Sequence, residues 1–460
     1  MVRAKRDHSS LGAMDSATKS HLGTLRAALE SGTLRQVQTL VNTLYPAEIA
    51  LLLECLPLPE RAVVWGLIDE ESEGDVLVEL IDEVRTKLIE EMDAEEVLAA
   101  TEGMELDDLA DLVADLPETI TDRIIESLSQ QDRERLKAVL SFPEDTAGGL
   151  MDPDTITVRP DVSLEVVLRY LRRSGKLPDK TAAVFVVDHN DCYIGALYIT
   201  RLVTEQLERT VREVMDPSMQ PIPSDRSAID VATDFQNRDL VSAPVIDDNG
   251  KLIGQITVDD VIDVIQEQAD HDILGMAGLD EEDDMFAPVI TSTQRRAIWL
   301  GVNLATAFIA AAVVAIFKPT IEKVVILAVM MPVVASMGGI AGVQTLTLMT
   351  RGLALGRVQD SNARWLLGKE IAVGLMNALT WALVVGIVTV VFFSTWDVGL
   401  IIAAALAINL LTAAFAGFTI PLVLQKLRID PALAGSVILT TVTDIVGFVA
   451  LLGLGTIFLT

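Results

Sequence analysis

The chain has 460 residues, half of them hydrophobic, and a formal net charge of -31 at pH 7. Residues 291–460 carry 10 Lys and Arg against 6 Asp and Glu, which leaves 25 against 60 for residues 1–290. So acidic a segment disfavours binding to nucleic acid or anionic lipid and favours cations as ligands, although a surface that is only solubilised or salt-adapted would have the same charge. Two cysteines, Cys55 and Cys192, exclude a disulfide framework and a zinc-ligand cluster. No apolar segment follows the basic N-terminal residues, so we expect no secretory signal.

The N-terminal part is predicted to be a helical domain. Residues 1–19 are polar and unpatterned, and we expect them to be disordered. Residues 20–144 have a helical pattern that prolines divide into short segments. Segments 34–44, 47–56 and 106–116 resemble one another, as helix pairs stacked in a small superhelical domain would.

The outer faces of these helices are dense in carboxylates, which include Asp107, Asp108 and Asp111. Oxygen-rich surfaces suit hard cations such as Mg²⁺, which keeps several waters and takes one or two carboxylates per site. The spacing of an EF-hand is missing, so we do not expect tight Ca²⁺ binding. The sequence therefore predicts that this domain binds Mg²⁺.

An α/β segment with an internal repeat follows at 145–262. We expect strands at 155–158, 182–187 and 193–197, and a helix at 164–172. The order then recurs, because Met151-Asp-Pro and Met215-Asp-Pro each open a unit. This duplication resembles a tandem pair of CBS domains, a regulatory fold that commonly binds adenine nucleotides or metals.

The resemblance makes the second unit a candidate ATP site. Its stretch from Gly254 to Asp260 matches the pattern in which a Thr and an Asp, here Thr257 and Asp260, hold ribose or phosphate. The first unit keeps Thr200 but has Arg201 where the Asp would be, so we expect one nucleotide site and not two. Thr257 and Asp260 could equally be the cap of a helix.

An acidic connecting helix and linker are predicted at 263–294. The polar helix extends from Val258 to about Met276, carries Asp260, Asp263 and Asp272, and is followed by the acidic run from Asp280 to Asp284. It leads toward the apolar half of the chain and would link a sensor to a pore mechanically.

The transmembrane domain is predicted at 295–460. Each apolar segment is long enough to cross a membrane, which takes about 20 residues. The segments are 297–317, 324–350, 370–393, 400–424 and 434–460. The loops on the side of the N-terminal half carry eight basic residues: Arg295, Arg296, Arg351, Arg357, Arg364, Lys369, Lys426 and Arg428. The other side has Lys318 and Lys323, so we expect a multi-pass protein of the plasma (inner) membrane with the N-terminal half in the cytoplasm and the C-terminus outside.

The last span contains one carboxylate, Asp444. A charge at this depth costs roughly 3 kcal/mol or more unless it has a partner, and it marks a candidate functional site. Thr440 and Thr441 precede Asp444 by four and three residues, so their hydroxyls share its helical face and could bond the carboxylate or its water. An ion pathway explains this polar stripe; an Asp that only holds the helices together is the alternative.

The second span has the composition of a broken helix that lines a pore. Carbonyls freed by a break can coordinate ions, whereas small residues can also serve only close helix packing. The residues concerned are Pro332, Ser336, Gly338, Gly339, Gly342 and Gln344. One amide in each remaining span, from Asn303, Asn377 and Asn409, is expected to join helices.

These features together resemble the family of MgtE-type magnesium channels and transporters, in order and over nearly the whole chain. The most specific stretches are Met331 to Gln344, Asp430 to Ala434 and Thr440 to Asp444. The resemblance implies a multi-domain fold: an all-α superhelical N-domain, an α/β tandem CBS pair, a connecting helix and an α-helical transmembrane domain with five spans.

The resemblance also implies a homodimer with the ion path on its two-fold axis. Asp444 of each chain would bind a largely hydrated Mg²⁺, with help from the carbonyl of Ala434. The acidic cytoplasmic domains would bind Mg²⁺ and thereby close the pore. The residues that match acidic sensing positions are Asp239, Asp260, Asp263 and Asp272.

Four positions depart from the family pattern. Ile340 and Val343 stand where many relatives have polar residues, which leaves strict Mg²⁺ selectivity open, with Co²⁺ and Ni²⁺ as minor substrates. Gln268 and His271 replace acidic residues and suggest fewer sensing ions or a shifted set-point.

The predicted function is a Mg²⁺-selective, channel-like transporter that cytosolic Mg²⁺ closes. The alternatives are a coupled exporter or exchanger of divalent cations and a membrane-anchored CBS sensor without transport. We do not expect an enzyme, because the sequence has no nucleophile paired with a base, no P-loop and no zinc motif.

Overall fold

The computed structural model describes residues 21, 23, 25, 27, 34–102, 104–114, 116, 118–174, 181–279, 284–359 and 361–460. These residues form two compact units. The first comprises the described residues up to 268 together with 284–288, and the second comprises 269–279 together with those from 289 onward. The predicted N-terminal tail and most of the acidic run after 279 lie outside the described residues.

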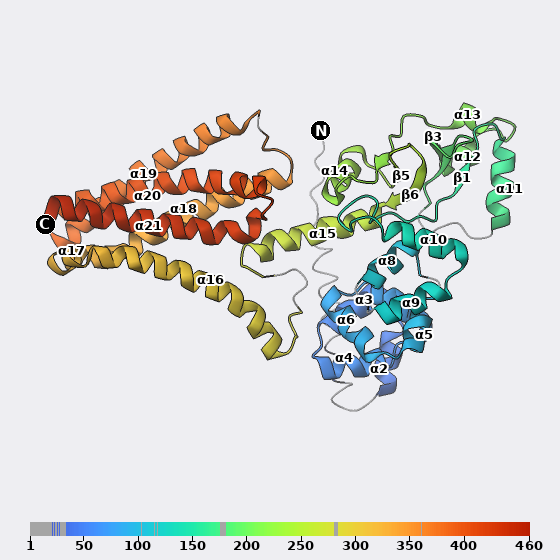
Figure 1. Ribbon diagram of the computed structural model, residues 1–460, viewed down its shortest axis with the longest axis horizontal. Coiled ribbons are helices and arrows are strands. Elements are labelled where there is room, and N and C mark those ends of the chain that lie inside the picture. Colours follow the sequence, from blue (N-terminus) through green and yellow to red (C-terminus); the bar gives the residue numbers. More distant parts are fainter. Residues whose placement is uncertain are drawn as a thin grey trace. The chain divides into compact units, whose positions relative to one another are not determined.

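Short helices form the N-terminal part of the first unit (Figure 1). They are α2 (Leu34–Val41), α3 (Pro46–Glu54), α4 (Leu58–Trp65), α5 (Glu70–Val78), α6 (Asp82–Glu91), α7 (Ala94–Ala100), α8 (Leu106–Ala114), α9 (Glu118–Ser127) and α10 (Gln130–Val139). Prolines lie in the first turn of α3 and α4, and Asp93 caps α7 by accepting from two backbone amides. Apolar faces that include Val37, Leu53 and Val76 meet in one core, and the predicted helical domain is confirmed.

Two copies of one α/β motif follow in the first unit, and their last helix continues into the second unit. The elements are β1 (Thr157–Val158), α11 (Leu164–Ser174), β2 (Ala183–Val187), β3 (Tyr193–Tyr198), α12 (Ile199–Thr204), α13 (Val211–Val214), β4 (Ile222–Pro223), α14 (Ala228–Arg238), β5 (Ser242–Ile246), β6 (Leu252–Thr257) and α15 (Val258–Gly275). Each three-stranded sheet pairs its first two strands in parallel and its last two antiparallel. The repeated α/β architecture is as predicted.

The Met-Asp-Pro motifs join the two copies. Asp152 exchanges backbone hydrogen bonds of 2.8 and 2.9 Å with Gln255 in β6, and Asp216 exchanges bonds of 2.7 and 3.0 Å with Ala196 in β3. A Cβ on Gly254 would lie 2.7 Å from the sulfur of Met151, and one on Gly195 would lie 2.9 Å from the carbonyl oxygen of Asp216. Glycine therefore recurs because the opening segment of the other copy crosses there.

The strand register corrects one detail of the sequence comparison. In the second copy, Ser242 at the start of β5 pairs with Thr257. In the first copy, Ala183 at the equivalent start of β2 pairs with Tyr198. Tyr198 and not Thr200 therefore occupies the place of Thr257, and the expectation that the first copy keeps the threonine was wrong. Arg201 does stand at the position of Asp260.

The second unit consists of long helices (Figure 1). They are α16 (Val289–Ile316), the short α17 (Lys318–Lys323), α18 (Val325–Ala354), α19 (Ala363–Phe393), α20 (Trp396–Lys426) and α21 (Pro431–Leu459). Five of these helices are long and apolar enough to cross a membrane, with mean hydropathy between 2.1 and 2.3. The central helix is α20, which packs against α18, α19 and α21. The five predicted spans are confirmed.

The predicted break in the second span is wrong, because α18 is one continuous helix with Pro332 inside it. Proline removes one backbone donor from the helix, and membrane helices accommodate this loss when neighbouring groups satisfy the freed carbonyl. Of the glycines that suggested a break, Gly338 and Gly342 lie against other helices, whereas Gly339 has no such neighbour within 4 Å.

Candidate functional site

Asp444 lies near the middle of α21 and is half-buried. Among the described residues, none forms a hydrogen bond or an ion pair with its carboxylate. Thr440 donates its hydroxyl to the carbonyl of Ser436 at 3.0 Å, and Thr441 donates to that of Val437 at 2.7 Å. The threonines thus bond to their own helix and not to Asp444, and their oxygens retain lone pairs for water.

Thr440 also lines a small cavity in the second unit. The cavity measures about 160 Å³, and its polar lining includes Asn303 of α16 and Ser436 of α21. Ser436, Thr440 and Asp444 follow one another at intervals of four residues and therefore share one face of α21. A polar stripe connects this cavity with the carboxylate.

The other predicted pore residue of α21, Ala434, lies in the first turn of the helix. Asp430 caps this end by accepting from the amides of Ala432 and Leu433 at 2.8 and 3.4 Å, and Pro431 follows the cap. Ten residues along a helix span about 15 Å, so Ala434 and Asp444 are not brought together within one chain.

Two glycines of α18 serve helix packing. A Cβ on Gly338 would lie 2.1 Å from Nδ2 of Asn409, and one on Gly342 would lie 3.0 Å from the side chain of Leu439. Asn409 of α20 is 0% exposed and donates to the carbonyl oxygen of Val334 at 2.8 Å. Asn409 therefore joins two helices, as predicted, and the packing explanation holds for both glycines.

The remaining candidates on α18 lie on another face. Pro332, Ser336 and Gln344 are exposed in this chain, and a Cβ on Gly339 would meet nothing within 4 Å. Ile340, one of the departures from the family pattern, lies between them on this face. Exposed polar side chains in a membrane span, here Ser336 and Gln344, are suited to a pore or a protein partner and poorly suited to lipid.

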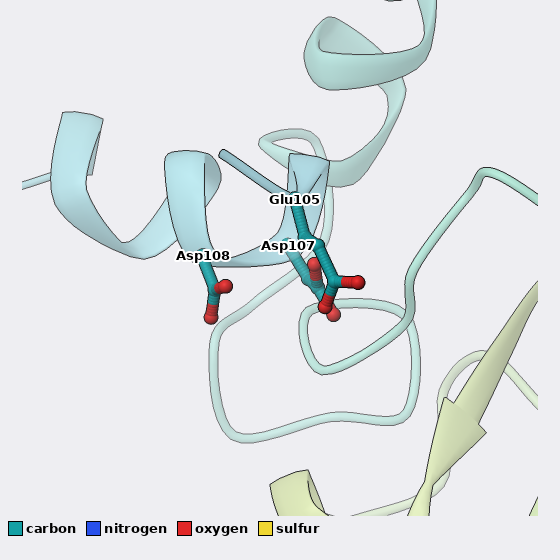
Figure 2. Close-up of side chains that lie close together, drawn as sticks. All are labelled: Glu105, Asp107 and Asp108. Carbon is teal, nitrogen blue, oxygen red and sulfur yellow. The ribbon is translucent and has the colours of Figure 1, made fainter. Parts of the chain in front are cut away.

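A second candidate centre lies at the start of α8 in the first unit. Glu105, Asp107 and Asp108 each offer one oxygen, and these oxygens lie within 4.8 Å of one another. Figure 2 shows the side chains of Glu105 and Asp107 close together, with Asp108 beside them. The side chain of Asp107 is buried, with 8% exposed, and its Oδ1 has no hydrogen-bond partner in the described part of the chain.

Burial raises the pKa of Asp107 to about 9, and the neighbouring charges of Asp152, Asp108, Asp260 and Glu105 add to this shift. Such a group either holds a proton at neutral pH or is stabilised by a cation. An orphaned, buried oxygen beside two further carboxylates fits a hard divalent cation, which prefers oxygen ligands.

The structure brings together only some of the predicted sensing residues. In the first unit, the charges of Asp108 and Asp260 both act on Asp107. Asp239 is exposed and ends α14 with a left-handed backbone, and Asp111 and Asp263 are exposed on α8 and α15. Asp272 belongs to the second unit.

Two acidic residues near this centre were missed, Glu105 and Asp152. The repeated Met-Asp-Pro motif could have indicated Asp152. Its pKa is raised by burial, and its backbone pairs with β6.

Thr257 and Asp260 form a helix cap. Asp260 accepts from the backbone amide of Thr257 at 2.9 Å, the arrangement that caps α15. A cavity of about 380 Å³ lies instead at the end of β3, lined by residues that include Tyr198, Gln220 and Arg238. ATP binding at Thr257 and Asp260 stays a prediction.

The end of the connecting helix contacts α21 within the second unit. His271 lies 2.9 Å from the carboxylate of Asp430, measured from Nε2 to Oδ2. Ser436 donates its hydroxyl to the carbonyl oxygen of Met276 at 3.3 Å. A residue that departs from the family pattern, His271, therefore contacts the cap of the helix that carries Asp444.

Models of three domain families match the chain in the order of its elements. The MgtE model, described as "Divalent cation transporter", matches residues 331–454, and the "MgtE intracellular N domain" matches 44–145. The CBS domain matches twice, at 147–208 and 211–267. The chain belongs to the MgtE family.

Curated members of the MgtE family are similar over nearly their full length. The magnesium transporter MgtE of Thermus thermophilus is 28% identical over 445 residues, which are 95% of this chain and 98% of that protein. The magnesium transporter MgtE of Bacillus subtilis is 23% identical over 431 residues, which are 94% of this chain and 96% of that protein.

A solved structure of the cytosolic domain of the Mg²⁺ channel MgtE in complex with ATP is 29% identical. The match covers 53% of this chain and 99% of that one, with a TM-score of 0.49.

Proposed function

We propose that this chain carries Mg²⁺ across the plasma (inner) membrane as a channel-like transporter. The observation that carries the proposal is Asp444: a carboxylate at the middle of a membrane span without a hydrogen bond or ion pair from any described residue. A charge held at such depth needs a partner, and a hydrated cation supplies one. The similar proteins named magnesium transporter MgtE, and the description of the matching family, support Mg²⁺ as that cation.

We further propose that the working form is a homodimer. Ser336 and Gln344 lie on a face of α18 that no described residue covers. A second copy would remove these polar groups from lipid, and it would place two Asp444 carboxylates about one ion path. The N-terminal half would face the cytoplasm and the C-terminus the outside, as the distribution of basic residues predicts.

Closure by cytosolic Mg²⁺ is supported by the centre at Glu105, Asp107 and Asp108. A bound cation would neutralise these carboxylates, and its loss would leave like charges that repel one another. The helix α15 carries Asp260 at its start, and its end contacts α21 through His271 and Asp430. A change at the acidic centre therefore has a continuous helix through which to act on the helix of Asp444.

The test is Mg²⁺ influx into proteoliposomes loaded with a Mg²⁺-sensitive dye, at low and high Mg²⁺ on the sensor side. Asp444→Asn is expected to lower influx roughly tenfold or more, because it removes the negative charge that attracts the hydrated cation into the membrane span. The matched control is Asp397→Asn at the exposed start of α20, which should retain influx.

The parent should conduct at low sensor-side Mg²⁺ and close at high Mg²⁺. If the unmodified protein binds Mg²⁺ or ATP but conducts under no condition, the function is that of a membrane-anchored sensor that does not transport. Influx that requires a Na⁺ or H⁺ gradient would identify a coupled exchanger instead.

A further inference from the structure

A buried ion pair holds the segment that precedes the first membrane span. Arg61 of α4 is 1% exposed, and its Nη1 and Nη2 lie 3.0 and 3.4 Å from the two carboxylate oxygens of Asp284. The guanidinium also donates from Nε to the carbonyl oxygen of Leu53 at 3.0 Å. This two-pronged pairing fixes both the position and the orientation of the carboxylate.

Backbone hydrogen bonds hold the same segment. The amide of Asp284 donates to Oε2 of Glu83 at 2.7 Å, and the amide of Phe286 donates to Oδ1 of Asp284 at 2.8 Å. Asp284 thus makes contacts through its amide and both carboxylate oxygens. Its side chain is almost fully buried, which distinguishes this contact from the exposed ion pairs of the chain.

The N-terminal helices depend on this carboxylate. An arginine keeps its charge in any environment, so a buried guanidinium needs an anionic partner. Glu54 also lies near Arg61, but burial raises its pKa and thus favours its neutral form. Asp284, which is 223 residues away in sequence, is the partner that Arg61 bonds.

The contact between Arg61 and Asp284 matters because the chain passes from the first unit to the second directly after it. The described chain leaves the first unit after residue 268, belongs to the second unit at 269–279, returns to the first at 284–288, and enters the second again at Val289. Val289 is also the first residue of α16, five positions after Asp284. Residues 284–288 are therefore a second covalent link between the units, in addition to α15.

We propose that Arg61 and Asp284 form a strap by which the N-terminal helices hold the segment before α16 and act on the first membrane helix directly. The regulatory consequence rests on the proposed function: with the strap in place, closure at high cytosolic Mg²⁺ reaches the membrane domain through both α15 and α16. Loss of the strap leaves only the route through α15, so closure requires more Mg²⁺.

The experiment combines hydrogen exchange with influx, both on the full chain. Asp284→Asn removes the charge and keeps the shape, and the double variant Arg61→Met with Asp284→Asn also removes the unpaired cation. The control is Asp154→Asn, which breaks the exposed pair between Arg135 and Asp154. We expect amide exchange at Asp284 and Phe286 to rise about tenfold in the single and double variants and to stay unchanged in the control.

In proteoliposomes, both strap variants should conduct, and the sensor-side Mg²⁺ concentration at half-closure should rise about threefold or more. Unchanged exchange in both variants would overturn the strap itself. Faster exchange with unchanged half-closure would overturn its regulatory role while transport stands. A parent without influx would remove the regulatory role together with the proposed function, whereas the exchange result would still decide whether the strap exists.

Discussion

At the scale of single residues, burial distinguishes the acidic groups that the sequence could only count. Asp107, Asp108 and Asp111 are equivalent members of an acidic run in the sequence, yet only Asp107 is buried with an oxygen that lacks a partner. Its environment depends on Asp152 and Asp260, which are distant in sequence and come close only through the α/β repeats. Composition therefore predicted a cation-binding domain but not which carboxylate is perturbed.

The perturbed pKa of Asp107 predicts a pH-dependent stability. The folded pKa, about 9, lies above the ordinary value of 3.8, so the folded state holds this proton more tightly than the unfolded state. The favourable contribution is complete below pH 3.8 and is lost as the pH rises toward 9. Without divalent cations, the melting temperature of the first unit should thus be lower at pH 8 than at pH 6.

Asp107→Asn should raise the melting temperature at pH 8, by roughly 2–4 °C for each kcal/mol gained, and should reduce the difference between the two pH values. Calorimetry in EDTA measures both. Asp111→Asn, at an exposed position of the same helix, should behave as the parent; an equal effect of the two substitutions would contradict the assigned role of burial.

At the scale of elements, length and hydropathy predicted the membrane helices well. The small residues of α18 did not predict whether that helix is broken or continuous. Each of the five spans was predicted from its apolar run, and the structure extends each of them at one end or at both. Proline and glycine in 332–344 indicate either a break or close packing, because a broken helix and a closely packed helix use the same residues. The distinction depends on Asn409 and Leu439, which reach Gly338 and Gly342 from other helices.

Two adjacent glycines of α18 test this distinction. Gly338→Ala places a methyl group 2.1 Å from the Asn409 amide, so we expect a destabilisation of about 1–3 kcal/mol. Gly339→Ala meets no neighbour within 4 Å in this chain, and alanine is the better helix former by about 1 kcal/mol. Thermal unfolding in detergent should therefore show a lower melting temperature for the first variant only.

At the scale of the whole molecule, the uneven distribution of charge along the chain predicted which part is soluble and which part lies in the membrane. A strongly acidic N-terminal half followed by an apolar half indicated a soluble part and a membrane part, and the matching models are an intracellular N domain and a divalent cation transporter. Cation binding by the acidic half stays a prediction. The strap was beyond sequence analysis, because Arg61 and Asp284 are single charges among many and nothing in their spacing relates them.

The same charge division predicts a specific response to Mg²⁺. At equal ionic strength, Mg²⁺ should raise the melting temperature of the first unit more than Na⁺ does, because site binding adds to screening. At a hundredfold excess over its dissociation constant, Mg²⁺ would contribute about 2.7 kcal/mol per site. If the two salts raise the melting temperature equally, the acidic surface serves solubility alone and holds no specific Mg²⁺ site.

The crossed pairing of the Met-Asp-Pro segments has a consequence for how this chain is assembled and inherited. Since Asp152 completes the sheet edge of the second repeat and Asp216 that of the first, neither repeat is a closed module. Synthesis must reach Asp216 before the first repeat can complete its pairing, and the second repeat needs Asp152, which is already made. A recombination event that exchanged one repeat alone would separate each edge from its complement. We therefore expect the two repeats to be exchanged between proteins only together.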